Sequence, residues 1–567
     1  MLTHEAWAWA RARPWLAWAA LVILMLADAG VLLRFQWNLT FFVDEWQLLV
    51  ERRRWDLDAF LRPLYEHLFL VPVAVFKVLM LAVGIGPRWV YGLPLIAMHL
   101  TCVALVYVLA RSRLGPWFAL APAALILFLG SSVDNMLLPI QISFLASTAA
   151  GLGMLLAFDG SSTRRRDGTA CILLGLSLAS SSLGLSFVVA ALAEVLTRPR
   201  WTRRLWIVLV PVLVYAAWFV VYGPTGLQQG GDLRGNVPFV PAHMAAAAAA
   251  VLGALAGLDL AWGRVLAVAG ALFVLGRVLS GERLSPRVIS LGLAVLVFWS
   301  VGGLARAHQH DPDASRYLYP AAVYIVLIGV EFLRPVRLGT RWAAVLAVGV
   351  AFAAIGNANS LRGARDSLQG FTRVLSAQFA ALEVLGRENV PPDFVAAVDL
   401  APGISAEDYF EMVDDLGSPV DGTQDLLHAP EEDRRRADAV LAQVLAATAR
   451  RSPNVNLVAP RPDVESIRFG RATLDDRCVR FDSASGGEGL MIVTARGPVV
   501  LIRALAGGPV EVSVRRFGGH FHPVGRLSAG SSRGWGLPSG DLPTPWRLRL
   551  SGRAGAEVCS AAFPAPG

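Results

Sequence analysis

The sequence predicts a polytopic α-helical membrane protein with a C-terminal extracytoplasmic α+β region that ends in a β-sandwich. Three observations support this fold class. First, 55% of the 567 residues are hydrophobic, 17% are charged and the mean hydropathy is +0.52, values outside the range of ordinary soluble domains. Second, apolar stretches of membrane-spanning length recur through residues 1–360. Third, residues 361–567 replace them with charged helical periodicity and then short β-prone runs.

Eleven apolar stretches approach the length of about 20 residues that a helix needs to cross the hydrocarbon core. They cover residues 15–34, 90–110, 115–131, 137–157, 169–182, 184–197, 205–222, 262–280, 288–304, 318–334 and 341–358. Two further apolar stretches are not counted as crossings: the first is interpreted as an interfacial or re-entrant helix of the first external loop, and the second as a loop helix. Residues 67–84 carry Pro72 and Lys77 in their middle, and residues 242–257 are rich in alanine.

Arginine clusters set the predicted orientation, because positive clusters mark cytoplasmic loops and these fall at alternate ends of the stretches. The clusters are Arg11 with Arg13, Arg111 with Arg113, Arg164–Arg166, Arg198–Arg204, Arg283 with Arg287, and Arg334–Arg341. We therefore expect a cytoplasmic N-terminus and, after eleven crossings, an extracytoplasmic C-terminal region. Counting either loop helix as a crossing would move the later loops to the opposite side.

Basic charge comes almost entirely from arginine, since Lys77 is the only lysine, and alanine is abundant. This composition is typical of a GC-rich bacterial genome, so a bacterial cell membrane is the expected location. The net charge of +8 is accounted for largely by the cytoplasmic loops. No nucleic-acid-binding motif is present, and nucleic acid is not an expected partner.

The chain divides into three predicted regions. Residues 1–360 form a transmembrane domain with a large first external loop at 35–89. Residues 361–453 form an external helical region, and residues 454–567 form the β-sandwich, where β-prone runs are bounded by Gly-Pro turns.

The four cysteines divide by location. Cys102 and Cys171 lie in apolar helices, where a small buried side chain is the simplest interpretation. Cys478 and Cys559 bracket the β-sandwich on the oxidising side of the predicted topology, which favours a disulfide between them. Their spacing is not that of metal ligands.

The first candidate site is Asp44 with Glu45, directly after the first apolar stretch. Two adjacent carboxylates are costly to hold near hydrocarbon, so chemistry or ion handling is the favoured explanation. A purely structural alternative remains: the pair could cap a helix or form salt bridges with Arg52–Arg54.

Further polar candidates fall on the same predicted face. They are Glu66, His67, Lys77, Asp134, Asn135, Gln141, Arg316 and Tyr317. Each group has a structural alternative. Glu66 and His67 could be ordinary helix-start residues, Asp134 and Asn135 could form an Asx turn, and Arg316 could be an interfacial anchor beside the aromatic Tyr317.

Taken together, these features resemble the GT-C glycosyltransferases, which include protein mannosyltransferases and bacterial aminoarabinose and lipopolysaccharide-sugar transferases. The resemblance covers residues 15–360 and lies in the placement of short motifs: an Asp-Glu pair opening the first external loop, polar residues in the second, and the string Ser315-Arg316-Tyr317-Leu318-Tyr319-Pro320 at a late helix. It implies that Asp44 is a catalytic base or orienting carboxylate. It also implies a polyprenyl-phosphate-linked sugar as donor, with the basic group of the late helix meeting the lipid phosphate.

The chemistry of such a transfer requires residues of these types. The acceptor hydroxyl loses its proton as the anomeric carbon gains oxocarbenium character, so a carboxylate such as Asp44 acts as general base. The departing phosphate is negative and is helped by a cation. Arg316 is the candidate, with Lys77 and His67 as alternates. The acceptor would be an envelope glycan, lipid or protein.

The sequence identifies no cofactor with certainty, and a divalent metal is possible in the loop that contains His308, His310 and Asp311. His520 and His522 lack a third ligand. Two other functions remain open. A transporter or flippase of envelope lipids or glycans would also place polar groups in a helical bundle, and the bundle could instead anchor a carbohydrate-binding sandwich.

Overall fold

The computed structural model describes residues 13–65, 67–227, 233–307, 312–336, 339–420, 424–451, 454–484, 488–538 and 542–563. The chain splits into two compact units. The first unit comprises Met1–Leu39, Glu51–Ala82 and Arg88–Leu368, and the second comprises Thr40–Val50, Val83–Pro87 and Gln369–Gly567. Two short segments of the predicted first external loop thus belong to the same unit as the sandwich.

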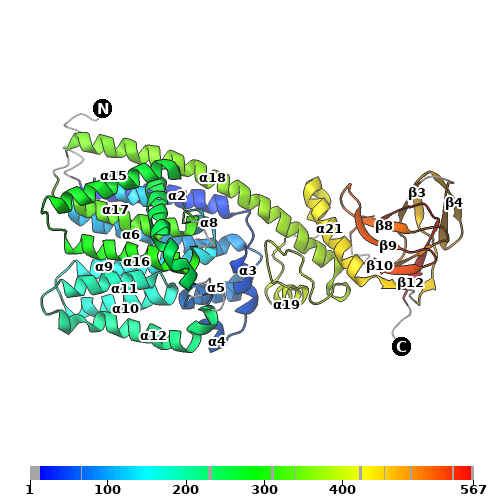
Figure 1. Cartoon of the computed structure of the whole chain (residues 1–567), viewed down its shortest axis with the longest axis horizontal. Coiled ribbons are helices and arrows are strands. Elements are labelled where there is room, and N and C mark those ends of the chain that lie inside the picture. Colours follow the sequence, from blue (N-terminus) through cyan, green and yellow to red (C-terminus); the bar gives the residue numbers. More distant parts are fainter. Residues whose placement is uncertain are drawn as a thin grey trace. The chain divides into compact units, whose positions relative to one another are not determined.

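The first unit is a helical bundle in which many helices run side by side (Figure 1). Its helices are α2 (Trp15–Gln36), α4 (Leu57–Leu61), α5 (Leu70–Val83), α6 (Arg88–Leu114), α7 (Leu120–Leu127), α8 (Val133–Leu137), η1 (Pro139–Gln141), α9 (Ile142–Phe158), α10 (Arg164–Ser180), α11 (Gly184–Leu196), η2 (Trp201–Arg204), α12 (Trp206–Leu227), α13 (Leu233–Asn236), η3 (Val237–Phe239), α14 (Val240–Ala256), α15 (Leu260–Leu279), α16 (Pro286–Arg306) and α17 (Ser315–Leu333). Helix α18 (Thr340–Leu385) begins in this unit and continues into the second.

Within the described ranges, nine helices are long and apolar enough to cross a membrane, which is consistent with a multi-pass membrane protein. The predicted number is eleven, and three predicted spans and one predicted loop helix account for the difference. Residues 115–131 do not form one helix, because α7 ends at Leu127 and the chain turns at Gly130. Helices α10 and α11 have 17 and 13 residues and fall short of the 18 residues of a candidate span, whereas the segment that contains α14 adds one candidate.

The alanine-rich stretch 242–257, which the sequence predicts to be a loop helix, lies almost entirely in helix α14. By length and composition the segment Leu233–Ala256 is among the nine candidates. However, the ring of His243 packs over Gly303, near the end of α16, while Asn357 Nδ2 donates to the carbonyl of Ala254 at 2.7 Å. The side chain of Asn357 also accepts a hydrogen bond from the N–H of Ser131. The next residue, Ser132, donates to the carbonyl of Ser315, the first residue of α17. Both ends of α14 therefore lie at one end of the bundle.

Helix α5 corresponds to the other predicted loop helix. It has 14 residues, about 21 Å of helix, which is too short for a hydrocarbon core of about 30 Å. Its Lys77 is buried, and the ammonium group donates to the carbonyl of Arg52 at 2.5 Å and to that of Arg54. Lys77 Nζ also lies 5.0 Å from the ring centroid of Trp55. The only lysine of the chain thus holds the preceding loop against α5.

The opposite end of the bundle is closed by ion pairs that range from buried to partly exposed, which we call the arginine network. Its arginines are Arg113, Arg198 and Arg287, and its acids are Asp159, Glu194 and Glu331. Arg287 joins Asp159 at 2.7 Å and Glu194 at 2.7 Å, and Arg113 joins Glu331 at 2.8 Å. These residues come from the ends of α6, α9, α11, α16 and α17. The basic helix ends in the network therefore lie at one end of the bundle, as the arginine pattern predicts.

The second unit contains α3 (Asp44–Glu51), the end of α18, and a β-sandwich. Its other helices are η4 (Arg387–Asn389), α19 (Ala406–Leu416), α20 (Asp425–His428) and α21 (Glu431–Thr448). Its strands are β1 (Arg450–Arg451), β2 (Asn456–Leu457), β3 (Asp463–Arg468), β4 (Gly470–Leu474), β5 (Cys478–Ser483), β6 (Gly489–Thr494), β7 (Val499–Ala504), β8 (Val510–Arg515), β9 (His522–Leu527), β10 (Ser532–Gly536), β11 (Arg547–Gly552) and β12 (Ala556–Ala562).

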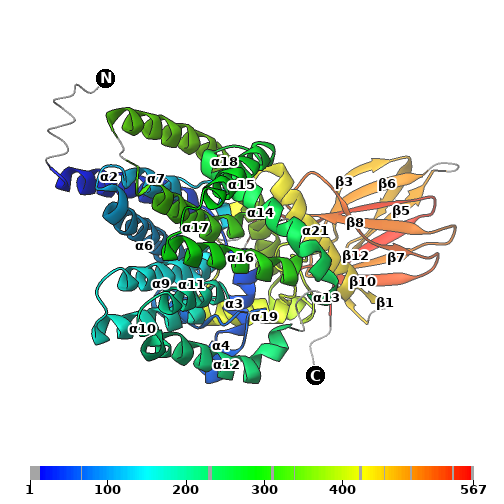
Figure 2. The same ribbon diagram turned by 60° about the vertical axis from the view of Figure 1, so that its left-hand side comes forward.

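The strands form two antiparallel sheets, which Figure 2 shows layered together. One sheet has the order β1-β10-β7-β12-β5-β4 with β2 paired to β12, and the other has the order β3-β6-β11-β8-β9. Strand β11 shows the cause of the layering, because Leu548 and Leu550 are fully buried while Arg547 and Arg549 alternate with them on the outer side.

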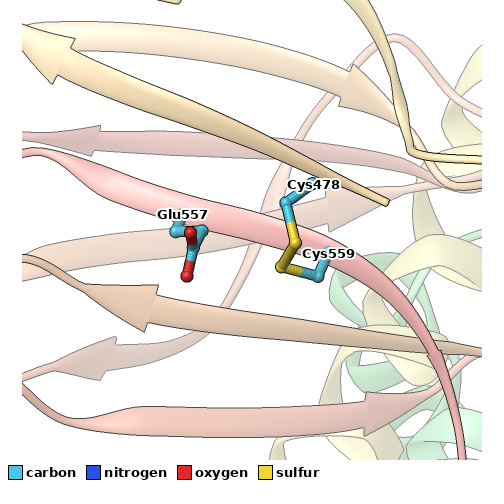
Figure 3. A group of neighbouring side chains, drawn as sticks. All are labelled: Cys478, Glu557 and Cys559. Atoms are coloured by element: carbon cyan, nitrogen blue, oxygen red, sulfur yellow. A yellow bond between two sulfur atoms is a disulfide. The ribbon is translucent and has the colours of Figure 1, made fainter. Parts of the chain in front are cut away.

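A disulfide joins Cys478 and Cys559, the pair that the sequence suggests (Figure 3). The two residues stand directly opposite each other on β5 and β12, with a Cα–Cα distance of 4.1 Å. Glu557 lies beside them on β12, and its carboxylate completes a three-residue group that could hold a metal if the thiols were free. Because the sulfurs are bonded to each other, this group is structural.

Candidate functional site

Asp44 lies at the end of a strained turn that the surrounding hydrogen bonds hold in place. Val43 has φ 33°, a left-handed conformation that a β-branched residue rarely adopts. Its N–H donates to the carbonyl of Leu400 at 3.2 Å and its own carbonyl accepts from Trp46 at 3.1 Å. The Phe42 N–H donates to Glu45 Oε2 at 3.0 Å. Such over-determined strain is typical of functional sites.

The two carboxylates of the predicted pair differ in surroundings. Glu45 is fully buried and its carboxylate bonds the backbone three residues earlier, which is the local structural role that the sequence leaves open. Asp44 is the first residue of α3 and is partly exposed. Trp46 anchors the turn, since its indole N–H donates to the carbonyl of Phe41 at 2.8 Å and its ring packs on Phe379. Asp44 is therefore the carboxylate of this pair that can reach a substrate.

In the first unit, the second predicted loop meets the start of α17. Arg316 Nη1 lies 4.0 Å from Asp134 Oδ2, and both side chains are about one-quarter exposed at 27% and 26%. The N–H of Asp134 donates to Ser315 Oγ at 3.2 Å, and Ser132 Oγ donates to the Ser315 carbonyl at 3.0 Å. Asn135 accepts from Ser132 Oγ at 2.8 Å. These contacts bring Asp134 and Asn135 together with Arg316. The Asp134–Ser315 hydrogen bond joins residues that are 181 positions apart in the sequence.

A small cavity of about 40 Å³ lies beside this pair in the first unit. His67 and Tyr317, both predicted site residues, line it together with Ser182 and Arg306. His67 Nδ1 and Ser182 Oγ are 2.6 Å apart and share a hydrogen bond. The guanidinium of Arg316 lies 5.2 Å from the centroid of the Tyr317 ring.

The loop that supplies His67 is itself strained. Tyr65 has φ 51°, and the guanidinium of Arg306 lies 5.5 Å from the centroid of its ring. Backbone hydrogen bonds between Leu64 and His67, at 3.1 and 3.0 Å, close the turn. Arg306 and Ser182 are site residues that sequence reasoning missed. The position of Arg306 at the end of a long apolar helix, on the predicted external face, is the signal that could have indicated it.

The other predicted residues have more distant or structural positions. Gln141 is buried in η1, and its Oε1 makes no hydrogen bond to the described residues. Lys77 is occupied by the loop carbonyls described above, so the structure gives it a structural role. Glu66, and the possible metal ligands His308, His310 and Asp311, lie outside the described residues.

The largest omission of the sequence-based prediction is a polar chain inside the bundle. Asp28 of α2 has its Oδ2 3.3 Å from His99 Nε2 of α6, and His99 Nδ1 is 2.9 Å from the Tyr319 hydroxyl of α17. All three are buried. Asp28 also lines an apolar cavity of about 350 Å³ between α2, α7 and α18. As the only acid in residues 15–34, it could have been singled out by the rule that intramembrane charges are functional.

The structure describes the two parts of the predicted site separately. Asp44 belongs to the second unit, whereas Asp134, Arg316, His67 and Tyr317 belong to the first. The first part combines guanidinium groups, aromatic rings and hydroxyl groups, a combination suited to an anionic group such as phosphate. The second part supplies a partly exposed carboxylate on a rigid turn.

No model of a known protein family matches the chain, and no curated protein matches it. The chemistry of these residues is therefore the basis for a functional proposal.

Proposed function

We propose that the chain is a membrane glycosyltransferase of GT-C-like architecture. It transfers a sugar from a polyprenyl-phosphate donor to an extracytoplasmic glycan, lipid or protein of the cell envelope. In this proposal the chain lies in a bacterial cell membrane with its N-terminus in the cytoplasm and its C-terminal region outside. The nine apolar helices and the gathering of basic helix ends in the arginine network support this arrangement.

The observation that carries the proposal is the Arg316–Asp134 pair beside the His67–Tyr317 cavity. At 4.0 Å and with both side chains about one-quarter exposed, this ion pair is loose and contributes about 1 kcal/mol or less. A phosphate can compete for the same guanidinium with two parallel charge-assisted hydrogen bonds. In this proposal Arg316 exchanges Asp134 for a lipid phosphate.

The proposed reaction needs a base as well as a cation. The acceptor oxygen forms a bond to the anomeric carbon while the bond from that carbon to the phosphate oxygen breaks. The acceptor proton passes to the Asp44 carboxylate, and the electron pair of the broken bond leaves with the polyprenyl phosphate. Arg316 stabilises the negative charge that develops on the leaving group.

The size of the cavity adds a requirement. A volume of about 40 Å³ is too small for a sugar ring, so the proposal requires the cavity, which His67 lines, to widen when the donor enters. Tyr65 is held in a left-handed conformation within the turn from Leu64 to His67, and such residues commonly occur where backbone switches between conformations. Movement of Tyr65 and His67 is therefore part of the proposed donor-binding step.

The test measures release of polyprenyl phosphate from a panel of short-chain polyprenyl-phosphate hexoses and pentoses, with the full chain in nanodiscs and envelope extract as acceptor. Asp44→Asn should lower the rate at least about 100-fold, because general-base help contributes that much or more. Arg316→Ala should weaken donor binding and slow release. Asp58→Asn is the matched control, since Asp58 is an exposed acid of the same predicted loop. Unchanged release by Asp44→Asn would remove Asp44 from its proposed role.

A second candidate function is proton-coupled transport, and the Asp28–His99–Tyr319 chain favours it. Buried carboxylate and imidazole groups between helices are typical of proton relays in transporters. The two functions separate by variant. For a glycosyltransferase, Asp28→Asn retains sugar transfer and Asp44→Asn loses it. For a transporter, Asp28→Asn abolishes flux driven by a pH gradient in proteoliposomes, whereas Asp44→Asn does not.

A further inference from the structure

The outer face of the five-stranded sheet carries three arginines close together. Arg515 of β8 stands directly opposite Arg547 of β11, and Arg549 lies two residues further along β11, opposite Ser513. Side chains two residues apart on a strand share a face, and neighbouring strands are about 4.8 Å apart. The three guanidinium groups therefore start from adjacent positions on one face, which we call the arginine face.

This arrangement is unfavourable for the isolated sheet, because like charges directly opposite each other destabilise a strand pair. Only one of the three arginines forms a direct ion pair. Arg547 Nε lies 2.7 Å from Glu465 Oε1 on β3, whereas within the described part of the chain Arg515 and Arg549 have no carboxylate oxygen within 4.0 Å, although the charge of Arg515 also acts on Glu465 and Asp438. Two guanidinium groups of the face therefore have no direct ion pair with the described residues.

Phe521 lies between Arg515 and Arg549, the two arginines that form no direct ion pair with the described residues. Its ring centroid is 4.5 Å from the Arg515 guanidinium and 5.2 Å from that of Arg549. Arg515 Nη1 also donates to the Gly519 carbonyl at 2.7 Å, while Arg549 reaches Ser513 Oγ only at 3.5 Å. The Nε groups of both arginines are buried and make no hydrogen bond to the described residues. The aromatic ring thus fixes two cations whose donors are incompletely used.

We propose that the arginine face binds an anionic polysaccharide, with sugar carboxylates meeting Arg515 and Arg549. A planar guanidinium binds a carboxylate through two parallel hydrogen bonds, and a polymer with an acid on each sugar presents such groups at regular intervals along an extended sheet face. Single-stranded nucleic acid fits less well, because it requires aromatic rings open for base stacking, and Phe521 is covered by guanidinium groups. This inference is independent of the proposed sugar transfer, since it concerns only the sandwich.

The opposite sheet offers a matched control. On its outer side Arg480 and Arg503 stand opposite Glu557 in the strand register, and Arg503 Nη1 lies 3.2 Å from that carboxylate. The control pair also has two arginines, but these two have an acidic partner on the same face. Removing them changes the total charge of the chain equally without touching the arginine face.

The experiment titrates oligogalacturonate, with neutral dextran as the comparison, into the full chain in nanodiscs of zwitterionic lipid. The wild type should bind oligogalacturonate, more weakly at high salt, and should not bind dextran. The Arg515→Gln/Arg549→Gln double variant should lose at least tenfold in affinity, and the Arg480→Gln/Arg503→Gln variant should stay within twofold. Arg549→Lys, which keeps the charge, should lose severalfold and serves if the double variant does not fold.

Several outcomes would overturn the inference. Absence of binding by the wild type, equal binding of dextran, or equal losses in the two double variants would each do so. Binding to phosphatidylglycerol nanodiscs without binding to oligogalacturonate would assign the face to lipid headgroups instead.

Discussion

At the scale of single residues, Asp438 shows how one buried carboxylate organises the second unit. It lies on α21 and accepts hydrogen bonds from the backbone N–H groups of Arg516, Phe517 and Gly518 at 3.0, 3.0 and 2.8 Å. Burial raises the pKa of Asp438 to about 6, although these three N–H groups oppose the shift. The helix and the loop after β8 are thus joined through a group that titrates near neutral pH.

The first prediction concerns the pH dependence of stability. The pKa of Asp438 is higher in the folded chain than the value of about 3.9 for an unfolded one. Between about pH 4 and pH 6 the folded state therefore binds more protons, so this residue's contribution to the unfolding free energy falls as pH rises, by about 2 to 3 kcal/mol in total.

The check is urea unfolding of the wild type and Asp438→Asn at pH 4 and pH 7, with hydrogen exchange at residues 516–518 as the probe of unfolding. The stability advantage of the wild type should shrink at the higher pH. A difference that stays constant or grows would show that Asp438 does not titrate in this way.

A second prediction at this scale concerns Val43. Glycine has no Cβ and adopts positive φ without penalty, so Val43→Gly removes strain of about 1–3 kcal/mol but increases the entropy of the unfolded chain by a comparable amount. We expect the unfolding free energy to change by about 1 kcal/mol or less while sugar transfer falls, because Asp44 loses its rigid support. Val43→Ala keeps the left-handed strain and is the control. Equal activity of the glycine variant and the wild type would contradict this role for the turn.

At the scale of secondary-structure elements, the arginine network ties together helices that are distant in sequence. Glu194 of α11 is the central acid, because it accepts from Arg287 Nε at 2.7 Å, Arg198 at 3.1 Å and Ser290 at 3.2 Å. Its side chain is 4% exposed. Removing one partner of a buried pair leaves an uncompensated charge.

Glu194→Gln should therefore lower the stability of the helical unit by about 3–5 kcal/mol. Its matched control is Glu282→Gln, which breaks an exposed pair with Arg277 and should change stability by about 1 kcal/mol or less. The stability of both variants is measured by thermal unfolding in detergent, with the accessibility of the buried Cys102 thiol as the probe. Similar losses for the two variants would contradict a central role for Glu194.

Individual helices were largely predictable from the sequence because hydropathy is a local property. The break between α7 and α8 was not, because its cause is remote: Gly130 approaches Asn357 so closely that a Cβ would lie 2.2 Å from the Asn357 carbonyl oxygen. The proximity of Asp134 to Arg316 follows from placing both at the external ends of predicted helices. The Asp28–His99 contact requires knowledge of which helix faces meet, and no local pattern provides it.

At the scale of the whole molecule, two units share one chain, and sequence composition indicates the change between them near residue 360. The boundary found at Leu368 lies inside the continuous helix α18. The segments Thr40–Val50 and Val83–Pro87 belong to the second unit, although they are far from it in sequence. Composition could not predict this membership, because it arises from contacts such as that of Val43 with Leu400.

The proposed topology yields a prediction for the intact cell. A cysteine at the exposed position Thr473 should react with a membrane-impermeant maleimide, because the sandwich is expected outside. Ser161→Cys, exposed in the loop before α10, should react only after permeabilisation. Mass spectrometry of the labelled peptides distinguishes these sites from Cys102 and Cys171. The reverse pattern of labelling would overturn the predicted orientation.

The arginine network has a consequence for how the chain would reach its membrane. Its three arginines and three acids cancel in formal charge once they have met in the folded bundle. During synthesis they emerge separately, and orientation during insertion depends on arginine and lysine, with little contribution from acids. On the proposed topology, the same guanidinium groups would first retain each loop in the cytoplasm as the nascent helices insert. They would afterwards form ion pairs with the three acids of the network. The same arginines would thus orient the helices during insertion and later form the ion pairs that hold the folded bundle together.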